Sequence, residues 1–266
     1  MTGRAPTGRS LLLDALADAV PSWIEADGSA RRTDVRRPHR GPADGLARGR
    51  VCLAAVEAFG DDRIEVESAV PAAVAVELAA GHVAVHRRTS LRLGDSDAES
   101  DPTRAILRGD ALLSVAFERL TALDVPASTR NSCLSALTDG CRRTQEARGI
   151  LADASFDSDG SELVQRLDSR LGALVGCAGS IAGLLAGVDD DRVDELERTA
   201  TRFGSELGFA RLREASILDA STVGTPAAID RHLDAVLDCL PEPCRADARS
   251  ALADLTRPGT HRSPEA

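Results

Sequence analysis

The sequence predicts an all-α protein built as a single domain. Apolar residues recur at helical spacing along almost the whole chain, and the alternation typical of strands is almost absent. Hydrophobic residues make up 43% of the 266 residues, which is enough for a core, whereas aromatic residues make up only 2%, which is unusual for a β-sandwich. Because no fixed repeat and no change of composition divides the chain, we expect one bundle of eight or more helices.

Helix-breaking residues place the boundaries of these elements. A first helix is expected over 10–25, and an Arg-rich irregular arm with two prolines follows it over 26–44. The domain core is expected over about 45–257, ahead of a polar tail over 258–266. Its helices are expected over 45–59, 66–89, 102–122, 127–153, 160–187, 190–217, 225–239 and 243–256, between breakers such as Gly60, Pro102, Pro126, Gly160 and Gly224.

The basic side chains are all arginine. The chain has 32 of them, no lysine and a formal net charge of -10. This acidic balance argues against a general polyanion binder, and the scarcity of aromatic residues argues against a base-stacking nucleic-acid module, so we expect no nucleic-acid partner. Lysine depletion with Asp-rich runs such as 94–101 is typical of adaptation to concentrated salt, and a GC-rich genome also replaces lysine by arginine. Both explanations stay open.

Six cysteines are present without any CxxC pair, and no secretory h-region is visible near the first residue. We therefore expect reduced thiols in a cytoplasmic protein, although Cys239 and Cys244 flank a turn that would let them meet. The uncharged stretch over 171–188 has nominal membrane length, but five glycines dilute its hydrophobicity. We interpret it as a buried central helix whose glycines admit a close neighbour or leave room for a cavity.

Four stretches, taken in order, carry a family resemblance. VPAAVAVELAAGHVAVH (70–86) and RAILRGDALLSVAFERL (104–120) precede RLGALVGCAGSIAGLLAG (170–187) and a C-terminal helix pair over 228–262. They resemble the trans-isoprenyl diphosphate synthase (polyprenyl synthetase) family in order and spacing. In that family the first stretch ends in an aspartate-rich motif, the second contains AI-x-x-GD-x-L-x-x-AF, and the third opens with Lys-Thr-x-x-Leu.

The resemblance implies an isoprenoid-synthase-like bundle around a central prenyl-chain cavity, usually a homodimer or heterodimer. It also implies a reaction in which an allylic diphosphate ionises and isopentenyl diphosphate attacks the resulting cation. The family neutralises the leaving diphosphate with about three Mg²⁺ ions held by two Asp-rich motifs. The presence of those aspartates therefore decides whether the family chemistry is expected here.

Both aspartate motifs are lost. After His86 the positions of Asp-Asp-x-x-Asp read Arg87-Arg88-Thr89-Ser90-Leu91, and an arginine cannot coordinate Mg²⁺. The acidic run over 94–101 could supply displaced carboxylates, but its Gly, Ser and Asp content is typical of a loop. FGSELGFARLREASILD (203–219) resembles the second motif and places Arg211, Leu212, Ala215 and Ser216 at its positions, so that only Asp219 remains acidic. We therefore assign no metal ligand, no metal cofactor and no catalytic residue.

The cations that bind diphosphate in the family are also fewer. Of Gly-Lys-Arg-x-Arg-Pro only Arg48 remains, and the Lys of Lys-Thr becomes Arg170. The Gly-Gln-x-x-Asp segment keeps Gln145 and replaces its acid by Arg148. Candidate diphosphate-binding residues are therefore Arg48, Arg87, Arg88 and Arg170, and His86, Gln145 and Asp219 are family remnants.

Three function hypotheses remain. The first is a non-catalytic or regulatory subunit that partners an active prenyl diphosphate synthase, or a binder of a prenyl ligand. The second is an active prenyltransferase in which Arg87, Arg88 and Arg170 hold the diphosphate directly. The third is unrelated chemistry on a helical scaffold: His82 and His86 stand four residues apart, which is metal-ligand spacing, but the sequence shows no third ligand. We interpret this pair as satisfied or partly exposed histidines.

Overall fold

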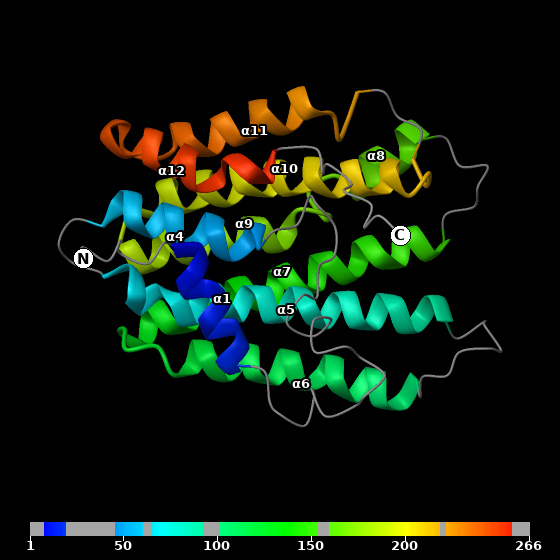
Figure 1. Cartoon of the computed structure of the whole chain (residues 1–266), viewed down its shortest axis with the longest axis horizontal. Coiled ribbons are helices and arrows are strands. Elements are labelled where there is room, and N and C mark those ends of the chain that lie inside the picture. The colour runs from blue at the N-terminus through cyan, green and yellow to red at the C-terminus, as the bar shows by residue number, and fades with distance from the viewer. Residues whose placement is uncertain are drawn as a thin grey trace, which may run out of the picture.

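The computed structural model describes residues 8–19, 46–60, 65–92, 102–153, 160–218 and 222–256, and these contain helices and no strand. The all-α prediction is therefore confirmed. The arm over 26–44, the tail over 258–266, the acidic run over 94–101 and Asp219 lie outside the described residues. The described helices, drawn in Figure 1, are α1 (Gly8–Ala19), α4 (Ala47–Phe59), α5 (Val66–Arg92), α6 (Pro102–Thr121), α7 (Ala127–Asp153), α8 (Gly160–Leu167), α9 (Ala173–Ala186), α10 (Asp190–Glu214), α11 (Pro226–Asp238) and α12 (Arg245–Leu252), with 3₁₀ turns at Glu242–Cys244 and Ala253–Leu255.

Helix α9 is the central helix of the bundle. It packs against α4, α7 and α10, and 12 of its 14 residues are buried. Glycines bring α10 close: a Cβ at Gly176 would lie 1.9 Å from Thr201 Oγ1, and a Cβ at Gly172 would lie 1.9 Å from the Thr201 carbonyl oxygen. The glycine spacing therefore serves a close helix contact, and the interpretation of a buried central helix is confirmed.

Helix α5 forms the other side of the core. Over Val66–Arg87 it is long and apolar enough to cross a membrane by length and composition alone, with a mean hydropathy of 1.6. However, 72% of its most apolar window is buried inside the protein, against α1, α4 and α6. Figure 1 shows α1 crossing over α4 and α5, while α6 runs along the opposite edge of α5. Its apolarity is thus explained by its place in the core.

The expected helix over 160–187 is interrupted, and that prediction is wrong in this detail. Ser169 adopts a left-handed conformation with φ 63°, and its backbone N–H donates to Asp168 Oδ1 at 2.9 Å. The chain turns there, so that α8 ends at Leu167 and α9 begins at Ala173. A second left-handed residue, Ser216 with φ 55°, follows the end of α10 at Glu214. Neither turn uses the glycine or proline that usually marks one.

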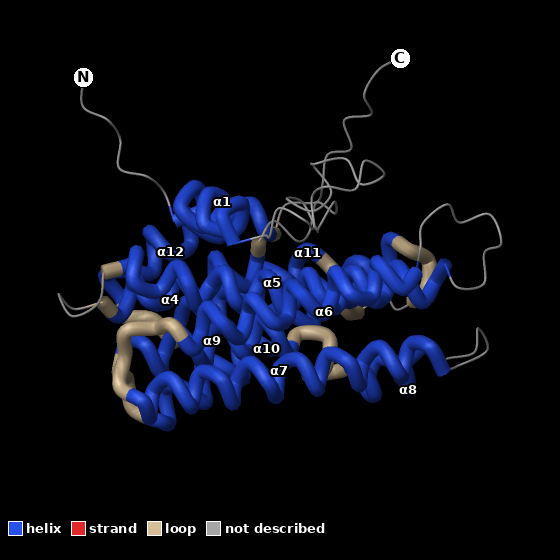
Figure 2. The backbone as a smooth tube through the Cα atoms, turned by 90° about the horizontal axis from the view of Figure 1, so that it is seen from below, coloured by secondary structure: helices blue, strands red, loops and turns tan. Residues whose placement is uncertain are grey.

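The apolar interior has two parts. The main core joins α1, α4, α5, α6, α7, α9, α10, α11 and α12. A smaller cluster at one end closes the space between α7, α8 and α10 with Ala147, Leu163, Leu167, Phe209, Leu212 and Leu218. Figure 2, turned by 90°, shows α7 as a long helix along one face of the bundle. The six cysteines are free thiols, as expected, and four of them are buried.

Candidate functional site

Two histidines of α5 lie against α6. His82 is 8% exposed, and its ring centroid lies 4.3 Å from that of His86, one turn later on the same helix face. The close approach of α6 depends on Gly109, because a Cβ there would lie 2.4 Å from His86 Cδ2. A side chain at position 109 would therefore displace the His86 ring.

Asp110 and Gln145 complete this cluster from two other helices. His86 Nε2 lies 3.1 Å from Asp110 Oδ1, and His82 Nδ1 lies 3.8 Å from the same oxygen. On its other side, His82 Nε2 lies 3.4 Å from the Gln145 amide nitrogen of α7. The family remnants His86 and Gln145 are thus brought together through His82. Asp110 was not predicted as a site residue, although the Gly-Asp of the stretch over 104–120 was a signal for it.

The environment keeps His82 neutral at neutral pH. Burial lowers its pKa below 6.5, and the neighbouring His86 and Arg148 lower it further, whereas the Gly109 backbone and Asp110 raise it. A neutral imidazole has one nitrogen with a free electron pair for a hydrogen bond or a metal ion. The cluster can therefore act as a hydrogen-bonding or ligating group rather than as a fixed cation.

Arginine side chains lie near the position of the first aspartate motif. Arg87 is exposed on the last turns of α5. Burial, and then repulsion by Arg87, lower the pKa of Arg148, which donates to Gln145 Oε1 at 3.3 Å. Arg88 belongs to α5, but its side chain is outside the described part of the structure. The described surroundings would repel Mg²⁺ and attract an anion.

The end of α10 is equally unsuited to magnesium. Arg211 is half-buried, and burial lowers its pKa to about 10, although Glu214 raises it. Ala215 and Ser216 are exposed at the positions of the lost aspartates. Mg²⁺ requires several hard oxygen ligands, and the described residues at the aligned positions supply no carboxylate. These residues do not fit the family's magnesium cluster.

Arg48, a candidate diphosphate ligand, is buried in an ion pair. Its guanidinium lies 3.6 Å from Glu77 Oε2, and the two side chains are 12% and 1% exposed. The Gly49 backbone N–H also donates to Glu77 Oε1, at 2.8 Å. Burial raises the pKa of Glu77, whereas Arg48 and the backbone N–H of Gly49 lower it. This arginine neutralises a carboxylate of α5 and is directed into the core.

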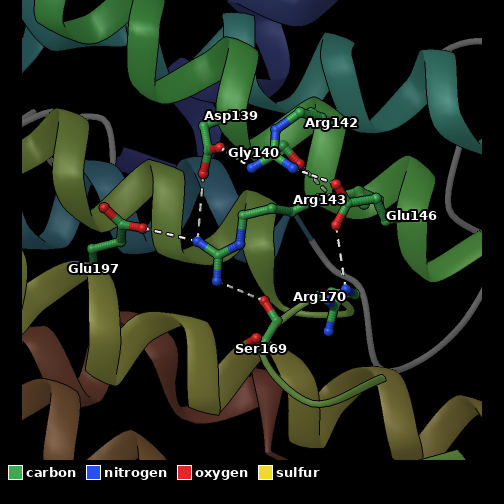
Figure 3. A network of polar contacts seen from close by, with 9 residues as sticks. Asp139, Gly140, Arg142, Arg143, Glu146, Ser169, Arg170 and Glu197 are labelled. Carbon is green, nitrogen blue, oxygen red and sulfur yellow. Dashed lines mark hydrogen bonds and ion pairs between the residues drawn. The ribbon is translucent and has the colours of Figure 1, made fainter. Parts of the chain in front are cut away.

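Arg170 belongs to a different network, shown in Figure 3. Its Nε lies 3.3 Å from Glu146 Oε2 and its Nη1 donates to the Arg166 carbonyl oxygen at 3.1 Å. Glu146 also pairs with Arg142, while Arg143 bridges Glu197 and the Ser169 carbonyl oxygen. The described contacts of Arg170 therefore join α7 to the turn before α9.

One open pocket among the described residues lies beside this network. It has a volume of about 390 Å³ and a polar lining of Arg143, Asp168, Ser169, Asp194, Glu197, Arg198, Thr201 and Arg202. Its charged walls do not suit a prenyl chain, which requires an apolar lining. This pocket is therefore not the expected central prenyl cavity, because it lies beside the Arg170 network and has a charged lining.

Known proteins resemble the chain in both sequence and fold. It is 28% identical over 166 residues to the small subunit of a heterodimeric geranylgeranyl pyrophosphate synthase of Arabidopsis thaliana, covering 58% of this chain and 49% of that protein. It is 30% identical over 185 residues to a geranylgeranyl pyrophosphate synthase of Geoglobus acetivorans, covering 65% and 55% respectively. The matches thus span about half the length of these relatives.

Structural similarity extends over nearly the whole chain. The geranyl diphosphate synthase small subunit of Antirrhinum majus superposes with a TM-score of 0.61 at 18% identity, covering 93% of this chain and 100% of that one. No protein-family model matches the sequence. The helical bundle is that of the isoprenoid synthases. Together with the sequence relatives, this fold supports membership of the trans-isoprenyl diphosphate synthase (polyprenyl synthetase) family.

Proposed function

We propose that this protein is a non-catalytic or regulatory subunit that binds an active prenyl diphosphate synthase and modulates its product. The proposal rests on the absence of negative charge among the described residues at the two motif positions. Arg87 stands where a magnesium ligand is needed, and uncharged Ala215 and Ser216 stand at the other motif. Without the metal cluster, the departing diphosphate lacks its main electrostatic stabilisation.

Two further observations support a subunit over an enzyme with an arginine-based site. Arg48 is paired with the buried Glu77, and Arg170 contacts Glu146, so neither guanidinium faces the site as an uncompensated cation. Two of the relatives and structures above are named as small subunits of prenyl synthases. We extend that role to this chain, as a soluble cytoplasmic protein that forms a heterodimer.

Exposed apolar side chains on α6 favour a partner surface. Leu107 is 58% exposed and Ile106 is 38% exposed, on a helix at the edge of the bundle. Contact with a second bundle would remove about 25 cal/mol of unfavourable hydration for each Å² of apolar surface covered. This face is therefore the place we assign to the active subunit.

The test is a prenyl-elongation assay on the purified protein. It uses labelled isopentenyl diphosphate and allylic diphosphates from dimethylallyl to geranylgeranyl, with Mg²⁺ or with EDTA, in high salt. We expect no product from the chain alone. Co-purification from the native cells should yield a prenyl synthase that carries both aspartate motifs, and adding this chain to that enzyme should change its product lengths.

The variant Arg87→Ala separates true activity from a contaminating synthase. Product that survives EDTA and disappears in Arg87→Ala would overturn the subunit proposal in favour of an arginine-based prenyltransferase. Product that is equal in the wild type and the variant comes from a contaminant and leaves the chain inactive, as proposed. An associated synthase whose products do not change when this chain is added would also contradict a modulating role.

A further inference from the structure

Three metal-ligand side chains converge between α5 and α6, outside both lost motifs. They are His82, His86 and Asp110, and one ligand atom of each lies within 4.8 Å of the others. The structure therefore supplies a third ligand that the sequence did not show. The three residues come from positions up to 28 apart in the chain, and only the packing of α6 on α5 joins them.

The separations fit a small transition-metal ion. Two ligand atoms at 2.0–2.1 Å from a tetrahedral ion lie about 3.3 Å apart. Here Asp110 Oδ1 lies 3.1 Å from His86 Nε2 and 3.8 Å from His82 Nδ1, one on each side of that value. The longer distance exceeds a hydrogen bond, so the Asp110 carboxylate does not bond His82 Nδ1 directly. An ion between the three atoms would join both histidines to this carboxylate.

The ligand types select the class of ion. Two imidazoles and one carboxylate favour Zn²⁺, Co²⁺, Ni²⁺ or Cu²⁺, whereas Mg²⁺ favours oxygen ligands alone. Burial keeps His82 in the neutral form that ligation requires. Asp110, which is 55% exposed, leaves an open side at which water would complete the coordination. Arg148 of α7 acts on His82, and Arg87 of α5 acts on Arg148. These positive charges weaken cation binding, so the affinity depends on the ligand bonds rather than on the local field.

Two neighbours support the ligands. Gly109 lets the His86 ring lie against α6 because a Cβ there would collide with the ring at 2.4 Å. Gln145 approaches His82 Nε2, the ring nitrogen opposite the ligating Nδ1, at 3.4 Å. With an ion on Nδ1, the remaining proton of the neutral His82 ring is on Nε2, beside the Gln145 side chain.

We propose that His82, His86 and Asp110 form a binding site for one divalent transition-metal ion of the zinc class, which links α5 to α6. The ion occupies the end of α5 just ahead of the lost aspartate motif. This site is independent of the proposed subunit role, since it requires neither a partner nor a prenyl substrate.

The experiment uses the full-length chain without a histidine tag, stripped with EDTA and titrated with Zn²⁺ or Co²⁺ by calorimetry. We expect one ion per chain, no competition by excess Mg²⁺, and a rise in melting temperature on loading. The Co²⁺ complex should show d–d bands without a thiolate charge-transfer band, because burial raises the pKa of Cys52 to about 12 and that of Cys133 to about 11.

Asp110→Asn and His86→Gln should each weaken binding at least about tenfold, and Gly109→Ala should do the same by displacing His86. The matched control is His232→Gln, which alters a histidine of α11 that lies beside Glu206 of α10. This variant should bind the ion like the wild type. Because Asp110 is half-exposed, its variant is expected to fold, and circular dichroism checks this. The proposal would be overturned if the chain bound no ion or bound it without a fixed stoichiometry. A thiolate charge-transfer band in the Co²⁺ complex, or equal binding by Asp110→Asn and the wild type, would also overturn it.

Discussion

Arg48 of α4 lies 3.6 Å from the carboxylate of Glu77 on α5, and the pair is almost completely removed from solvent. A residue that the family pattern offers as a diphosphate ligand thus stabilises the contact between two core helices. Removing one partner of a buried ion pair leaves the other charge without compensation. Arg48 therefore has a structural role as the partner of Glu77.

The variant Arg48→Met tests this role. It should lower the free energy of unfolding by about 3 to 5 kcal/mol, because Glu77 then remains buried beside an apolar side chain. Urea denaturation followed by circular dichroism measures the change. The control is Arg249→Met, which removes an ion pair with Asp234 in which both side chains are 52% exposed, and should cost less than about 1 kcal/mol. Equal costs for the two variants would contradict the buried-pair role.

The contact between α9 and α10 predicts unequal effects of alanine at two glycines. In Gly172→Ala the new Cβ would lie 1.9 Å from the Thr201 carbonyl oxygen and 2.5 Å from the Ser205 backbone nitrogen, so the two helices must move apart. We expect a loss of about 3 kcal/mol or more in urea denaturation. In Gly149→Ala on α7 the Cβ meets nothing within 4 Å, and helix propensity should raise stability by about 0.5 to 1 kcal/mol. Losses of similar size would show that the close packing is not what requires Gly172.

The fold was largely predictable because helical periodicity and the α9 glycines report burial directly. The break at Ser169 could not be predicted, because the left-handed residue is a serine stabilised by the adjacent Asp168 and not the glycine or proline that usually marks a turn. The structure brings only some of the candidate site residues together. His86 and Gln145 lie in one cluster, but Arg48 and Arg170 pair with carboxylates elsewhere. The role of Asp110 depends on how α6 packs on α5, and a sequence pattern does not give the pairing of residues across two helices.

Thiol reactivity should separate the buried cysteines from the partly exposed ones. Cys52, Cys133, Cys177 and Cys239 are buried, and burial raises the pKa of each. Burial also raises the pKa of the partly exposed Cys141, to about 11, so this thiol should react more slowly than Cys244. With a disulfide reagent at about pH 8, we expect reaction at no more than two thiols of the native protein, Cys141 and Cys244, and at six thiols after unfolding. Cys244→Ser should remove one of the reactive thiols of the native protein and leave the four buried cysteines unreactive. Rapid reaction of three or more native thiols would contradict the buried core.

His232 predicts how stability depends on pH. Burial lowers its pKa below 6.5, with Arg231 and Arg202 acting in the same direction and Glu206 and Asp168 opposing them. In the window just below 6.5 the unfolded chain binds more protons than the folded one, so stability falls as pH decreases through this window. Urea denaturation at about pH 7.5 and about pH 5.5 should show a smaller loss in His232→Gln than in the wild type. The variant retains some loss because His82 shifts in the same direction, whereas an unchanged loss would exclude His232 as a contributor.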